Sequence, residues 1–169
     1  MCSATTRDLG YRLHVAEPKA AYVNRPPLVM DASVIAAALF GEGGRAEVIA
    51  LLHGRALHAP HLLDHEIASV GLHKLRREKL ASGVIAAALQ AYARLPIERH
   101  AVDVGALVVI AERYDLTAYD AAYIYVAEQL AAPLATLDDK LAAAAHAYLV
   151  ADRQVHEPAR SVGHPLNTD

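Results

Sequence analysis

The sequence has 169 residues and a mass of 18.1 kDa, enough for one domain with its own core and too little for two ordinary ones. Hydrophobic residues make up 54% of it and charged residues 21%, which excludes disorder as the main state. The formal net charge of −3 excludes nucleic-acid binding through bulk positive charge, so any such contact is expected to be local.

Other features exclude further classes of protein. The single cysteine, Cys2, excludes an internal disulfide and a cysteine-based zinc site. No apolar run is long enough to cross a membrane, and no secretory signal is visible. We therefore expect a cytoplasmic protein with no membrane association.

The chain divides into three parts by composition. Residues 1–27 mix charged and small polar residues and end in two prolines, so we expect an N-terminal extension. The domain is expected over residues 28–150, and the last residues, 151–169, are expected to form a C-terminal tail.

Short apolar runs alternate with helical patterns from Leu28 onwards. Strands are predicted at 28–30, 56–59, 96–100 and 133–136, with a weaker candidate at 148–150. Helices are predicted at 34–40 with Ser33 as the cap, and at 45–53, 60–79, 84–94, 102–114, 117–131 and 141–146. This alternation predicts the α/β class: a single three-layer α/β/α domain with a short central parallel sheet.

Acidic residues occur where strands end or where carboxylates are unusual. Asp31 ends the first predicted strand, and Asp138 follows the strand at 133–136. Glu66 falls on the apolar stripe of its helix, where an unpaired carboxylate is unfavourable. Asp120 lies three residues after Thr117, the predicted cap of its helix. Each acid also has an ordinary explanation, namely a helix dipole, a buried ion pair or a capping role.

In an open α/β sheet these four positions converge beyond the carboxyl ends of the parallel strands. Unpaired carboxylates repel one another, and a hard divalent cation relieves that repulsion. Oxygen-only ligands favour Mg²⁺ or Mn²⁺ over Zn²⁺, and such an ion can lower the pKa of a bound water and bind a phosphodiester. The residues therefore predict a Mg²⁺ (or Mn²⁺) site formed by Asp31, Glu66, Asp120 and Asp138.

The segments around these acids, at 28–33, 63–67, 116–123 and 134–138, resemble the successive motifs of the PIN domain, and more closely those of VapC-type toxins of bacterial toxin–antitoxin pairs. The similarity covers about residues 28–150. It implies a PIN-like fold and a metal-dependent endoribonuclease that hydrolyses RNA phosphodiester bonds by metal-activated water. It also implies a homodimer and a cognate VapB-type antitoxin. The resemblance assigns catalysis and metal binding to Asp31, Glu66, Asp120 and Asp138, and supporting hydroxyls to Ser33 and Thr136.

Histidines give a weaker metal signal. His58, His61 and His65 have spacings that zinc ligands can show. However, His61 opens a helix after a proline and His65 lies beside the apolar stripe, so we favour ordinary surface and core roles.

Five further features have open interpretations. The basic run at 73–79 is either a solvated helix end or a rim that guides phosphates beside the acidic pole. Asp103 is a candidate outer acid of the site, and Asp139 is either a participant in the site or, as we favour, a solvated residue at a helix start. The alanine-rich helices at 84–93 and 141–147 suit close packing, either in the core or between subunits.

Three other functions are considered. A haloacid-dehalogenase-type phosphatase needs a second acid two residues after Asp31, where this sequence has Ser33. A receiver-type signalling domain needs a lysine after the last strand, and Lys140 is poorly placed for it. A catalytically inactive PIN module that only binds a partner is disfavoured because all four acids are present.

Overall fold

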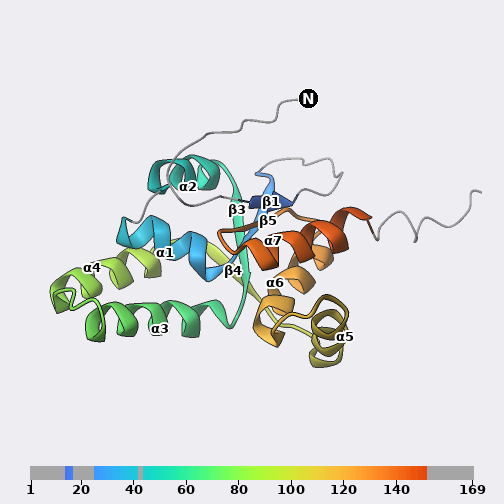
Figure 1. Ribbon diagram of the computed structural model, residues 1–169. Helices are drawn as coiled ribbons and strands as arrows, with labels where there is room; N and C mark the ends of the chain where they lie inside the picture. The colour runs from blue at the N-terminus through green and yellow to red at the C-terminus, as the bar shows by residue number, and fades with distance from the viewer. Residues whose placement is uncertain (1–13, 17–24, 42–43, 152–169) are drawn as a thin grey trace, which may run out of the picture.

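The computed structural model describes residues 14–16, 25–41 and 44–151 of the chain (Figure 1). The strands are β1 (His14–Ala16), β2 (Pro27–Met30), β3 (Ala56–Pro60), β4 (Ile97–His100) and β5 (Leu134–Thr136). The helices are α1 (Ala32–Phe40), α2 (Arg45–Leu52), α3 (Leu63–Arg76), α4 (Ser82–Ala93), α5 (Val104–Tyr114), α6 (Ala118–Gln129) and α7 (Asp139–His146), and a π-helical turn η1 (Ala147–Ala151) follows α7.

The strands form one sheet in the order β1-β5-β2-β3-β4. β2 is parallel to both β3 and β5, and β3 is parallel to β4, as predicted. Only β1, at the edge, runs antiparallel to its neighbour β5. The chain moves from β2 towards β4 and then returns to the other side of β2, so the strand order reverses between β2 and β5. Ligands of open α/β sheets bind beyond the strand ends at such a reversal.

Helices cover both faces of this sheet, which confirms the predicted three layers. Figure 1 shows α1 to α4 on one side of the strands and α5 to α7 on the other. Right-handed crossovers explain the division, because connections that move in opposite directions along a parallel sheet place their helices on opposite faces.

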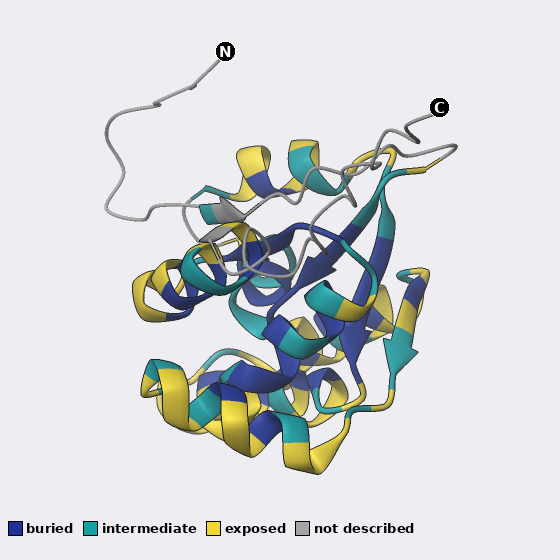
Figure 2. Ribbon diagram, turned by 90° about the vertical axis from the view of Figure 1, so that its right-hand side faces the viewer, coloured by how far each residue is buried: buried dark blue, intermediate teal, exposed yellow. Residues whose placement is uncertain are grey.

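The core lies along the central strand. Leu28, Val29 and Met30 of β2 are fully buried, as expected for a strand covered on both faces. On α6, Tyr123 and Ile124 are also buried against the sheet, and Figure 2 shows the central strands buried while exposed residues lie on the outer helices. None of the described helices is both long and apolar enough to span a bilayer.

Two local predictions were wrong. Ser33 does not cap α1: the cap is Asp31, whose carboxylate accepts a hydrogen bond from the Val34 amide. Ser33 instead lies in the first turn of the helix. The strand candidate at 148–150 is part of η1, because the chain after α7 continues as a helix that buries Leu149 in the core.

Several predicted boundaries also shift. The helix predicted over 60–79 begins at Leu63, since Pro60 belongs to β3, and it ends at Arg76, before the left-handed residue Lys79. The helix after it begins at Ser82, two residues before its predicted start.

The predicted extension contributes to the sheet. Within residues 1–27, His14–Ala16 form β1, and β2 begins at Pro27, one residue before the predicted domain start. Residues 1–13 and 17–24, and the predicted tail after Ala151, lie outside the described residues.

Candidate active site

Asp31 lies at the end of β2, at the point where the strand order reverses, and is only 7% exposed. Its carboxylate accepts hydrogen bonds from the Ser33 hydroxyl (2.6 Å), the Thr136 hydroxyl (2.8 Å) and the Val34 amide (3.2 Å). Burial raises the pKa of Asp31, and these hydrogen bonds oppose the rise. The structure thus holds a carboxylate rigidly in a position where its charge is unfavourable.

The two hydroxyls that hold Asp31 also position the segment after β5. Ser33 Oγ accepts a hydrogen bond from the Leu137 amide (2.9 Å), and Thr136 Oγ1 accepts one from the Asp138 amide (3.0 Å). Asp138 is exposed and caps α7 by accepting a hydrogen bond from the Leu141 amide. Thr136 therefore links the carboxylate of Asp31 directly to the backbone of Asp138.

Glu66 reaches the same end of the sheet from the first turn of α3. It is partly buried, and its carboxylate accepts a short hydrogen bond from the hydroxyl of Tyr123 on α6. Burial is the largest cause of the raised pKa of Glu66, and the negative charges of Asp31 and Asp120 raise it further. The hydrogen bond from Tyr123 acts in the opposite direction. Glu66, Asp31 and Asp120 are thus close enough for their charges to interact.

Asp120 occupies the predicted place in a capping box. The Thr117 hydroxyl donates to the Asp120 carboxylate (2.7 Å) and accepts from the Asp120 amide (3.1 Å). The cap fixes the start of α6, and with it both the charge of Asp120 and the ring of Tyr123 one turn later.

The charges of Asp31 and Asp120 each interact with that of Glu66, and Asp138 is joined to Asp31 through hydrogen bonds of Thr136.

The candidate outer acids have other roles. Asp103 caps α5, and Asp139 is 2.6 Å from His14 of β1. Tyr123 was not among the predicted site residues, because in the sequence it belongs to the apolar face of its helix. Its position three residues after Asp120 is the one sequence signal that could have placed its hydroxyl near the acids.

The acids fit a hard divalent cation. All four offer carboxylate oxygens, the donors that Mg²⁺ and Mn²⁺ prefer. In the described part of the chain, no lysine or arginine forms an ion pair with any of them. Uncompensated negative charge around the buried Asp31 is what a bound cation would neutralise.

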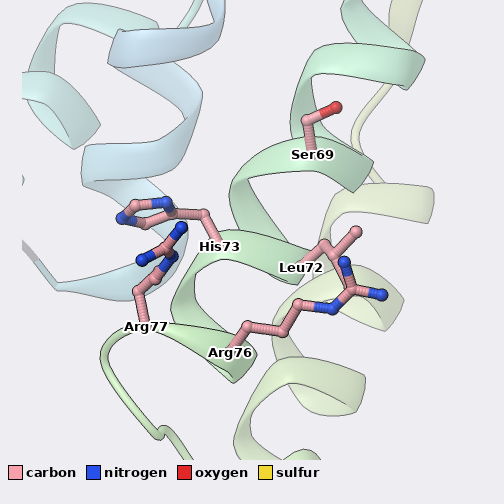
Figure 3. Close-up of a pocket in the computed structure, with 5 residues that line it drawn as sticks. All are labelled: Ser69, Leu72, His73, Arg76 and Arg77. Atoms are coloured by element: carbon pink, nitrogen blue, oxygen red, sulfur yellow. The ribbon is translucent and has the colours of Figure 1, made fainter.

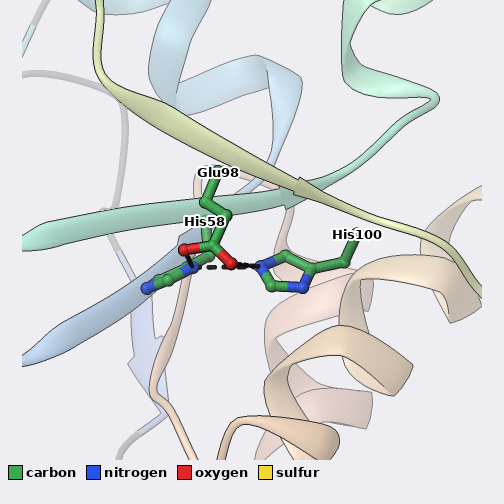
Figure 4. Close-up of side chains that lie close together, drawn as sticks. All are labelled: His58, Glu98 and His100. Carbon is green, nitrogen blue, oxygen red and sulfur yellow. Dashed lines mark hydrogen bonds and ion pairs between the residues drawn. The ribbon is translucent and has the colours of Figure 1, made fainter.

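The predicted histidine group takes a different form. His61 and His65 do not join His58; instead His100 of the adjacent strand does, with 3.0 Å between His58 Nδ1 and His100 Nε2 (Figure 4). Glu98 completes the group, and its ligand atoms and those of the two histidines all lie within 4.8 Å of one another. Among the described residues, no other group of three or more potential metal ligands lies this close together.

The basic run at 73–79 divides between two environments. Lys74 is buried, forms an ion pair with Glu78 (3.2 Å) and lies over the Phe40 ring. Arg76 and Arg77 are exposed, and with residues from the preceding turns of α3 they line a pocket of about 240 Å³ (Figure 3). The lining residues are Ser69, Leu72, His73, Arg76 and Arg77.

Comparisons with known proteins show the family to which the chain belongs. The family model described as "PIN domain" matches residues 28–147, from the start of the central strand to the end of α7. Ribonuclease VapC9 of Mycobacterium tuberculosis is 43% identical over 116 residues, which are 68% of this chain and 87% of the relative. Ribonuclease VapC1 of the same species is 37% identical over 122 residues, 69% of this chain and 89% of the relative. Ribonuclease VapC3 of Pyrobaculum aerophilum is 33% identical over 121 residues, 68% of this chain and 92% of the relative. The chain therefore belongs to the PIN domain family, among its VapC ribonucleases.

Proposed function

We propose that the protein is a Mg²⁺- or Mn²⁺-dependent endoribonuclease that acts as the toxin of a toxin–antitoxin pair. The observation that carries the proposal is the set of carboxylates at the sheet reversal, where Asp31 is buried and the charges of Asp31 and Asp120 raise the pKa of Glu66. The names of its relatives, ribonucleases of the VapC group, support RNA as the substrate.

The proposed roles follow from the local geometry. Asp31, Glu66, Asp120 and Asp138 would hold the divalent cation, which when bound supplies charge neutralisation and polarisation of a phosphodiester. Ser33 and Thr136 keep the Asp31 carboxylate in one orientation, and Tyr123 does the same for Glu66. We therefore assign these three hydroxyls to positioning, and the four carboxylates to catalysis.

The pocket on α3 supports a path for the RNA backbone. Three residues follow Glu66 at helical spacings, namely Ser69 three residues later, His73 seven later and Arg77 eleven later. They therefore lie along the same side of the helix as Glu66. At about 1.5 Å per residue, His73 is about 10 Å from Glu66 along the axis. Arg76 and Arg77 lie ten and eleven residues after Glu66, about 15 to 17 Å along the axis. We infer that they bind phosphates a few nucleotides from the scissile one, which offsets the repulsion between RNA and the acids.

We also propose that a VapB-type antitoxin inhibits by placing an arginine among the acids. A guanidinium offers planar paired donors that match carboxylates, and it can replace the charge of the cation. Raising the Mn²⁺ concentration should then weaken binding of an arginine-bearing antitoxin peptide. Equal affinity for the wild type and an Asp31→Asn/Glu66→Gln variant at every Mn²⁺ concentration would place inhibition elsewhere.

The enzymatic proposal is tested with the full chain and an unstructured RNA. Cleavage should require Mg²⁺ or Mn²⁺ and stop in excess EDTA. Asp31→Asn keeps the side-chain shape and removes one anionic ligand, so kcat/KM should fall by about 100-fold or more, about 2.7 kcal/mol of transition-state stabilisation. Asp115→Asn, at an exposed position on the α5–α6 turn, serves as the matched control. Cleavage at an unchanged rate in EDTA would refute the mechanism, and no cleavage by any metal-loaded form would favour an inactive binding module.

A further inference from the structure

We propose that His58, Glu98 and His100 form a second metal site, for a transition ion of the zinc class, across strands β3 and β4. The proposal does not rest on the ribonuclease activity, because none of these residues belongs to the acidic site.

The parallel register brings the three side chains to one face of the sheet. His58 pairs directly with Glu98, and His100 lies two residues after Glu98 on the same strand. Residues paired across parallel strands, and residues two apart along a strand, point to the same side. The group is therefore held by the backbone ladder, and Figure 4 shows the three side chains turned towards one another.

The distances are near those of a ligand set. His58 Nδ1 is 3.0 Å from His100 Nε2, and the Glu98 oxygens are 3.7 Å from His58 Nδ1 and 3.9 Å from His100 Nε2. Nitrogen ligands about 2.0–2.1 Å from a tetrahedral ion are about 3.3 Å apart, so the two histidine nitrogens need to separate by only a few tenths of an ångström. One Glu98 oxygen must move closer to both nitrogens, because the two distances involve different oxygens. Glu98 can make most of that shift, because its side chain is 69% exposed.

The donor chemistry differs from that of the acidic site. Two imidazoles and one carboxylate suit Zn²⁺ and neighbouring transition ions, whereas carboxylates alone suit Mg²⁺ and Mn²⁺. Three protein ligands leave a fourth position for water on the exposed side of Glu98. A bound ion would tie the edge strand β4 to β3 and so stabilise the folded state by mass action. When both rings are neutral, one ring nitrogen can donate a hydrogen bond to the other, which accounts for their 3.0 Å contact.

The test uses the full chain in an Asp31→Asn/Glu66→Gln background, so that the acidic site contributes little to metal binding. After chelator treatment the protein is titrated with Zn²⁺ by calorimetry and with Co²⁺ by visible absorption. We expect one ion per chain, Co²⁺ bands of a four-coordinate site, and a higher melting temperature in Zn²⁺. Because the sequence holds 10 histidines, comparison with matched variants is essential.

His100→Ala and Glu98→Gln should each lower the Zn²⁺ affinity about tenfold or more and abolish the thermal shift. His61→Ala, which removes an exposed neighbouring histidine, should change neither. The variants are compared by their melting temperatures in EDTA, and Glu98→Gln, at an exposed position, keeps the test valid if His100→Ala fails to fold. Equal Zn²⁺ affinity in the wild type, His100→Ala and Glu98→Gln would overturn the proposal, as would the absence of four-coordinate Co²⁺ bands. Loss of RNA cleavage in the background variant bears only on the proposed nuclease.

Discussion

Asp31 is the only buried carboxylate in the described part of the chain. Its burial raises its pKa above the unfolded value of 3.8, so the folded state binds the proton more tightly than the unfolded state. The resulting stability is complete below pH 3.8 and is lost as the pH rises through the raised folded value. In metal-free protein, Asp31 should therefore destabilise the fold at neutral pH.

Asp31→Asn should remove this unfavourable buried charge. We expect its melting temperature in EDTA to exceed that of the wild type at pH 8, by about 3 °C for each kcal/mol relieved, and the difference to vanish towards pH 4. Thermal melts between these pH values measure the effect. Asp115→Asn, at an exposed carboxylate whose pKa is lowered by Lys140, should show no such gain. A variant less stable than the wild type at pH 8 would contradict the assignment of Asp31 as a destabilising charge.

Tyr123 offers a second prediction for a single side chain. Tyr123→Phe keeps a ring that is 1% exposed and removes the hydroxyl that donates to Glu66. Because that hydrogen bond lowers the pKa of Glu66, its loss should raise the pKa further. The acidic limb of kcat/KM against pH should therefore move to higher pH. Tyr92→Phe, whose hydroxyl donates to Asp64 instead, is the matched control, and an unmoved limb in Tyr123→Phe would leave Tyr123 a purely structural role.

Helix α3 carries both an acid and the proposed phosphate-binding residues. Its amino-terminal turn holds Glu66, and its carboxyl-terminal end presents Arg76 and Arg77 while Lys74 packs against Phe40. One helix therefore sets the distance between the reacting phosphate and the neighbouring phosphates.

The double variant Arg76→Ala/Arg77→Ala should raise KM for RNA about tenfold with little change in kcat, because these residues bind the substrate away from the reacting group. The salt dependence of RNA binding should weaken as well, by about 0.7 in the slope of log K against log salt for each phosphate that the variant no longer neutralises. Arg94→Ala, on an exposed residue at the end of α4, provides the control. An equal fall in kcat and kcat/KM would instead indicate that the two arginines act on the transition state.

For the whole molecule, exposed apolar residues indicate where a second copy would bind. Val104, Val108 and Val109 of α5 are 74%, 59% and 65% exposed, and Tyr119 at the start of α6 is 68% exposed. The alanine-rich α7 instead buries its apolar residues inside the subunit. We therefore propose α5 as the centre of a twofold interface.

Val108→Glu should shift the protein from a dimer to a monomer of 18.1 kDa at micromolar concentration, because it buries a charge at the proposed interface. Light scattering coupled to size exclusion measures the mass. Ile49→Glu, at an apolar residue of α2 that is 49% exposed, should leave the mass unchanged. A monomeric wild type would contradict the proposed homodimer, and a dimeric Val108→Glu variant would place its interface elsewhere.

The α/β class and most of the elements could be predicted from the sequence, because strands and helices leave different spacings of apolar residues and these spacings are local. The sequence also indicated which acids to examine, since Asp31 and Asp138 follow strands and Thr117 with Asp120 forms a recognisable cap. The segment at 148–150 shows where local patterns fail: three apolar residues fit either a strand or a helix, and the packing of Leu149 decided between them.

The contacts between distant side chains follow from the folded arrangement of the strands and helices, and the sequence did not predict them. Tyr123 donates to Glu66 across 57 residues of sequence, Thr136 donates to Asp31 across 105, and His58 meets His100 across 42. The order of the strands and their register create these contacts, and no local spacing encodes them. The same is true of burial, which raises the pKa of Asp31 and turns an ordinary helix cap into a charge that a cation can neutralise.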